Sequence, residues 1–127
     1  MRVKLIATLA VLGLALAVCV ASMLFVFTLV DQMEVMAAVV LERMDVNDTV
    51  GAREALSQLA EKWARAGGWL KSLTPHEDLH EVSIHATEAA TTLEAGDTDD
   101  FRRSMALLME SLKHLREHES FSLSNVL

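Results

Sequence analysis

The chain has 127 residues, of which 52% are hydrophobic, and it carries 18 acidic against 11 basic residues. This length allows one domain of modest size. The negative balance argues against a nucleic-acid partner, because nucleic-acid interfaces need basic patches. The single cysteine, Cys19, allows no disulfide within one chain, so cysteine usage does not identify the compartment.

The most prominent segment is an uncharged run over residues 5–30, LIATLAVLGLALAVCVASMLFVFTLV. As a helix it would be about 39 Å long, whereas a bilayer core of about 30 Å needs about 20 residues. A cleaved signal peptide is the alternative, but its apolar region is usually only about 7–15 residues long. The run therefore predicts an uncleaved transmembrane helix that contacts the lipid bilayer through residues 5–30.

Charge predicts the orientation of this helix. Arg2 and Lys4 lie in a basic start, residues 1–4, and Asp31 and Glu34 follow the run. Basic residues stay on the cytoplasmic side, so we expect a cytoplasmic N-terminus and an extracytoplasmic domain over residues 31–127. Without Arg2 and Lys4, nine basic residues face 18 acidic ones, a net charge of −9, which argues against docking on an anionic lipid surface.

Within the run, Gly13, Ala17 and Ala21 recur every fourth residue. Such a small-residue row permits close approach of a second helix, so it is a possible transmembrane packing face, although rows of this kind are common by chance. Apart from the Cys19 thiol the run has no ionisable group, which is typical of an anchor and not of a transport path.

Apolar residues at helical spacing predict four helices, over about residues 31–46, 49–73, 75–95 and 98–118. The first continues directly from the membrane helix. Asn47-Asp48-Thr49 predicts a break and a new helix start, and Gly67-Gly68 in the second helix predicts a bend or a close helix contact. Their apolar stripes are Leu29, Met33, Met36, Val40 and Met44; Ala52, Leu56, Leu59, Trp63, Ala66, Leu70 and Leu73; Leu79, Val82, Ala86, Ala89 and Leu93; and Phe101, Met105, Leu108, Leu112 and Leu115.

The last two stripes mirror each other about residue 97, as an antiparallel hairpin with a tight turn at Gly96-Asp97 requires. The tail is expected to pack back through Phe121, Leu123, Val126 and Leu127. The predicted fold is all-α: a transmembrane helix that continues into a small antiparallel bundle of three or four helices.

One motif suggests chemistry. His76-Glu77-x-x-His80 has the spacing with which a helix holds zinc and a catalytic glutamate. However, Thr74-Pro75-His76-Glu77 is also a capping box, in which Thr74 and Glu77 bond each other's backbone amides at a helix start. The cap gives Glu77 a structural role that needs no metal.

Three features argue against a zinc protease. Asp78 places a charge at a position of the motif that is generally uncharged, and Ser83 and Ala86 stand where the longer form of the motif has glycine and a third histidine. His85 lies about 140° around the helix from His80. The small domain also leaves little room for a substrate cleft. We therefore predict no catalytic residue, no cofactor and no metal, with His76 and His80 as weak metal candidates only.

Other side chains allow weaker hypotheses. His76, His80, His114 and His118 lie at matching heights of the predicted hairpin but leave on opposite flanks, so a four-histidine site needs a second molecule. They are expected to be solvated, and protonation below about pH 6.5 is expected to loosen that end. Trp63 and Trp69 are expected to pack in the core. The methionines Met33, Met36 and Met44 are also expected in the core, although such faces also suit adaptable partner surfaces.

The order of features also carries a resemblance. Trp63, the segment HEDLHEVS from His76, the acidic turn GDTDDF from Gly96 and the ending ESFSLSNVL resemble a family of small bacterial single-span proteins known as domain of unknown function 4363. The resemblance covers nearly the whole chain. It implies a bacterial cell-membrane protein in an accessory role beside a multi-spanning membrane protein, and it brings no catalytic residue.

Together these features predict a non-enzymatic, membrane-anchored interaction module that binds a multi-spanning membrane protein or forms a homodimer. The alternative is a sensor-like extracytoplasmic bundle that binds a small ligand or a metal. The zinc metalloprotease is the remote alternative, and replacement of Glu77 by glutamine separates it from the others, because a cap tolerates glutamine.

Overall fold

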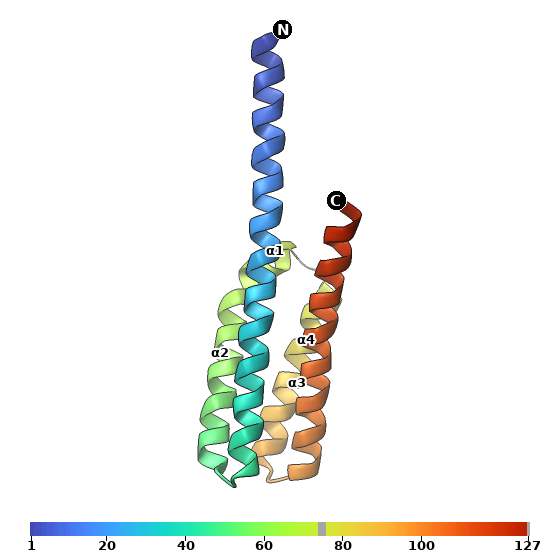
Figure 1. The fold of residues 1–127 in the computed structure, drawn as a ribbon. Coiled ribbons are helices and arrows are strands. Elements are labelled where there is room, and N and C mark those ends of the chain that lie inside the picture. Colours follow the sequence, from blue (N-terminus) through green and yellow to red (C-terminus); the bar gives the residue numbers. More distant parts are fainter. Residues whose placement is uncertain (74–75, 127) are drawn as a thin grey trace.

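The computed structural model describes residues 1–73 and 76–126, with side chains for residues 1–72 and 76–119. These residues form helices and short turns, with no strand among them. The helices are α1 (Arg2–Asp45), α2 (Thr49–Leu73), α3 (His76–Glu94) and α4 (Thr98–Val126), as Figure 1 shows.

The four helices form an antiparallel bundle in which each packs against two neighbours. Consecutive helices lie side by side, and α4 closes the ring by packing on α1, while the backbones of the diagonal pairs are farther apart in the described part of the chain. This arrangement is the up-down-up-down topology that short connections favour. The predicted all-α bundle is confirmed, including the α3–α4 hairpin and a long apolar N-terminal helix.

Local sequence explains where the helices turn. Asn47 has a φ of 60° after α1, and the Asp48 carboxylate accepts a hydrogen bond of 2.9 Å from the Gly51 amide at the start of α2. Gly96 has a φ of 75°, which glycine adopts without strain. Asp97 then caps α4 by accepting a bond of 3.1 Å from the Asp100 amide.

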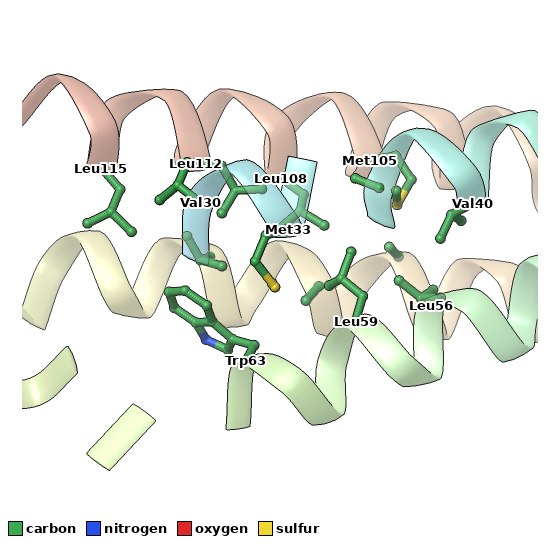
Figure 2. Close-up of a cluster of buried hydrophobic side chains, with 14 of the residues drawn as sticks. Val30, Met33, Val40, Leu56, Leu59, Trp63, Met105, Leu108, Leu112 and Leu115 are labelled. Carbon is green, nitrogen blue, oxygen red and sulfur yellow. The ribbon is translucent and has the colours of Figure 1, made fainter. Parts of the chain in front are cut away.

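The core lies along the axis of the bundle, where one stripe from each helix meets the others (Figure 2). The stripe of α4 is the most deeply enclosed: from Phe101 to Leu115 every member is 0% exposed. The buried members of the other stripes are Val26, Leu29, Val30, Met33, Ala37 and Val40 in α1, Ala52, Leu56, Leu59, Trp63, Ala66 and Leu70 in α2, and Leu79, Val82, Ala86, Ala89 and Leu93 in α3. The predicted stripes are therefore confirmed, with Met36 and Met44 only partly buried; the side chain of Leu73 lies outside the described residues.

The long helix α1 has two halves with opposite surroundings. Its residues up to Phe25 are exposed or only partly buried, and they stand clear of the bundle as a single helix (Figure 1). From Val26 onward, α1 buries one stripe against α2 and α4. The apolar run of the sequence is thus shared between the projecting half and the bundle.

Two details differ from the expected helices. α4 runs to Val126 and not to about residue 118, while the side chains of the tail, whose packing was predicted, lie outside the described residues. α2 passes through Gly67-Gly68 as one continuous helix. A Cβ added at either glycine would meet nothing within 4 Å. Of the two alternatives predicted there, a bend or a close helix contact, the close contact is therefore wrong, and the bend stays a prediction.

Candidate functional site

The zinc-like motif opens α3 as a solvent-facing pair of histidines. His76, Glu77 and His80 are all exposed, and the described residues contain no group of three His, Cys, Asp or Glu side chains that could hold a metal ion. Thr74 lies outside the described residues, so the capping box with Glu77 stays a prediction. Nothing in the described geometry brings a third ligand to His76 and His80.

The buried member of this motif is Asp78, which the sequence reading treated only as an obstacle to zinc. The Asp78 side chain is 9% exposed. Its Oδ2 lies 2.5 Å from Nδ1 of His118 on α4, as a buried carboxylate requires a partner. A signal was present in the sequence, since residues 78 and 118 lie close to the mirror register of the hairpin.

This contact sets the protonation behaviour of His118. The hydrogen bond with Asp78 and the charge of that carboxylate raise the pKa of His118 above its usual value. Protonated His118 therefore favours the folded hairpin. For this histidine, the expectation that protonation loosens the end of the bundle is wrong.

A second link joins α4 to α1 near the same end. Arg116 forms an ion pair with Asp31, and its Nη2 lies 3.4 Å from Oε2 of Glu34. These carboxylates are the first charges after the apolar run. Partly exposed pairs of this kind contribute about 0.2–1 kcal/mol each, so the two links mainly fix how α4 lies against α1 and α3.

Between α1 and α2, also at this end, lie two adjoining hollows of about 360 Å³ each that share Phe25 and Trp69; together they are called the α1–α2 groove. Its apolar part, toward the projecting half of α1, is lined by Val18, Ala21, Ser22, Phe25 and Trp69. Its polar part, toward the bundle, includes Thr28, Gln32, Lys62 and Arg65.

The two tryptophans of α2 have different environments. Trp63 is 8% exposed, and its indole donates a hydrogen bond of 2.9 Å to Ser83 on α3. Trp69 is 72% exposed and lies over the α1–α2 groove. Core packing is confirmed for Trp63 and wrong for Trp69, which stands one position before the stripe residue Leu70.

A further hollow, of about 510 Å³, lies between α3 and α4 and is lined by polar residues that include His85, Glu88 and Arg103. The alternative hypothesis, a bundle that binds a small ligand, would place the ligand in this hollow. His85 already contacts Glu88 on its own helix at 3.2 Å.

The small-residue row Gly13, Ala17 and Ala21 is exposed on the projecting half of α1. A Cβ added at Gly13 would meet no atom within 4 Å. Of the three residues, Ala21 also lines the α1–α2 groove. No contact within the described residues covers the row at Gly13, and its use as a transmembrane packing face stays a prediction.

Comparison with known families identifies the class of protein. A family model described as a domain of unknown function (DUF4363) matches residues 20–126. The chain therefore belongs to this family, and the match covers the packed half of α1 and the rest of the bundle. No curated protein and no solved structure matches the chain.

Proposed function

We propose that this protein is a single-pass membrane protein whose four-helix bundle rests on the outer surface of the cell membrane and serves as a non-enzymatic interaction subunit. The observation that carries the proposal is the projecting half of α1, which is apolar on all sides and exposed. Exposed apolar patches of this extent mark a membrane or a partner surface.

The length of the projecting half fits this role. From Leu5 to Phe25 the helix would span about 30 Å, close to the thickness of a bilayer core. Val26, Leu29 and Val30 are packed into the bundle, so the membrane segment would be shorter than residues 5–30. The bundle would then follow the membrane with no stalk between them, and Arg2 and Lys4 would keep the N-terminus in the cytoplasm.

The partner we propose is a multi-spanning membrane protein or a second copy of this chain. The exposed row of Gly13, Ala17 and Ala21 supports a helix contact inside the membrane, because small residues allow two backbones to approach closely. A bundle held at a fixed height above the bilayer by α1 would present α3 and α4 to the outer parts of the same partner.

Crosslinking in native membranes, followed by purification and mass spectrometry, tests this proposal. The expected result is one dominant companion, either a multi-spanning protein or the chain itself. The double substitution Gly13→Leu and Ala17→Leu should lose it. The control, Val11→Leu and Ala15→Leu, adds bulk on the opposite face of α1 and should retain it.

Two results would contradict the proposal. Recovery of the protein without any companion would contradict the interaction role. It would favour the ligand-binding alternative, with the hollow between α3 and α4 as its site. The second result is an enzymatic activity of the chain that Glu77→Gln abolishes without changing the unfolding midpoint. It would support a catalytic role for the histidine motif.

A further inference from the structure

We propose that the α1–α2 groove binds one anionic phospholipid from the outer leaflet, with the lipid phosphate between Lys62 and Arg65 and an acyl chain along α1 beneath Trp69. The inference rests on the proposed membrane span and adds to it a lipid site within the protein.

The groove has the polarity that a phospholipid requires. On α2, the residues at 62, 65 and 69 follow one face of the helix. On α1, the residues at 18, 22, 25, 28 and 32 follow another face at the same period. Because the two helices are antiparallel, the polar ends of both rows meet on the bundle side and the apolar ends meet on the projecting side.

The dimensions agree with this placement. Lys62 and Trp69 are seven residues apart, a rise of about 10 Å. The headgroup layer on each side of a bilayer is roughly 5–8 Å thick. If Trp69 lies at the hydrocarbon boundary, beside Phe25, then Arg65, about 6 Å above it, lies at the level of the lipid phosphates and Lys62 lies just above that level.

Charge complementarity selects an anionic headgroup. Four arginines of the bundle, Arg43, Arg53, Arg102 and Arg116, pair with carboxylates. Lys62 and Arg65 have no such partner in the part of the chain that the structure describes. The groove has no acidic residue in its lining, so both cations are available to a phosphate.

The net charge of the domain makes this a single site and not a general adhesion. With 18 acidic residues in the chain, most of the surface repels anionic lipid. The groove is the local exception to this negative surface. Trp69 lies over it, and tryptophan is favoured at membrane–water interfaces because an indole has an apolar body and one polar N–H.

Native mass spectrometry of the full chain tests the site after extraction from nanodiscs of either phosphatidylglycerol or phosphatidylcholine. We expect one retained phosphatidylglycerol per chain. Lys62→Gln with Arg65→Gln should weaken retention by roughly tenfold or more, because basic residues near a membrane surface each contribute measurably to anionic-lipid binding. The control is Arg103→Gln with Lys113→Gln, which removes one arginine and one lysine that are exposed on α4 outside the groove and should leave lipid retention unchanged.

Several outcomes would overturn the site. Equal retention of the two lipids would contradict selection of an anionic headgroup. Equal retention by the wild type and the Lys62/Arg65 variant, or the same loss in the control variant, would contradict binding at these two residues. Displacement of the lipid by excess inorganic phosphate would contradict recognition of a whole lipid. Carbonate extraction of the cell membranes that contain the protein separates the two proposals. A chain that resists extraction but retains no lipid contradicts the lipid site alone, whereas a chain that is extracted contradicts the membrane span.

Discussion

The two halves of α1 have similar hydrophobic residues and opposite environments. Up to Phe25 the helix is apolar on every side and touches little of the rest of the chain. From Val26 to Asp45 one apolar stripe faces the bundle, while the other faces carry the charged residues together with exposed apolar residues such as Val35 and Val39. The hydrophobic residues alone do not distinguish the halves; the charged residues do, because the first half has none between Leu5 and Phe25 and the second carries them away from its buried stripe.

This difference indicates what each half contacts. A helix with one apolar stripe buries that stripe against other helices of its own chain. A helix that is apolar all round cannot bury every side in a bundle of four short stripes, so under the proposal above the membrane covers its remaining surface. The α1–α2 groove lies where the two halves meet.

The largest effect is expected from charges placed in the projecting half of α1. Leu12→Arg with Leu16→Arg costs about 2.5–3.5 kcal/mol for each arginine near the centre of a membrane helix, so the variant should leave the membrane fraction after carbonate washing. Val35→Arg with Val46→Arg places the same charges on exposed sites of the bundle half and should stay in the membrane. Retention of both variants would contradict a membrane span.

Truncation of a buried side chain in the bundle should lower the free energy of unfolding, whereas the same truncation in the projecting half of α1 should not. Leu112 is 0% exposed and Leu16 is 50% exposed. Leu112→Ala should lower the free energy of unfolding by about 2–5 kcal/mol, and Leu16→Ala should leave it unchanged. Urea unfolding of the full chain in detergent, followed by Trp63 fluorescence in a Trp69→Phe background, measures both; equal effects would contradict the division of α1.

Much of this architecture could be predicted because it depends on periodicity and on turn chemistry. The α4 stripe and the capped starts at Asp48 and Asp97 are local in sequence, and each is found in the structure. The contact between Asp78 and His118 was missed although the two residues lie near the mirror register of the hairpin. It depends on which flank of each helix faces the other, which height along a hairpin does not determine.

The exposure of Trp69 was also missed, for a different reason. Its position beside the stripe residue Leu70 made burial the ordinary expectation for so large an apolar side chain. What distinguishes it is its height beside the uncharged part of α1, a relation that appears only once α1 and α2 are placed in register.

A smaller change in stability is expected at the glycines of α2, which lie near the level where the two halves of α1 meet. Gly67→Ala and Gly68→Ala should each raise the stability of the bundle by about 0.5–1 kcal/mol, because glycine is a poor helix former and neither added methyl group meets another atom. Gly51→Ala is the matched control: its Cβ would overlap the Asp48 carboxylate that caps α2, so it should destabilise. A loss of stability in the first two variants would show that the α2 end is more tightly packed than described.

The smallest effect expected is a pH dependence at the α3–α4 contact. The pKa of His118 is raised by Asp78, and more weakly by Glu117 and Glu119, so its stabilising contribution is fully present below the unfolded pKa of about 6.5 and is lost as the pH rises through the folded pKa. The urea midpoint of the wild type should exceed that of His118→Gln by more at pH 6 than at pH 8.5. The same comparison in an Asp78→Asn background should lose this trend, because the carboxylate that pairs with His118 is removed. A difference that grows with pH would contradict the assigned direction.

The division of α1 is tested most directly by the accessibility of single cysteines in spheroplasts. In a Cys19→Ser background, cysteine would be placed at Leu9, Leu14, Val35 or Val46 and treated with a membrane-impermeant maleimide. We predict labelling at Val35 and Val46 and none at Leu9 or Leu14, with the boundary near Phe25. Labelling at Leu14, or protection of Val35 until the membrane is permeabilised, would show that α1 does not cross the membrane as proposed.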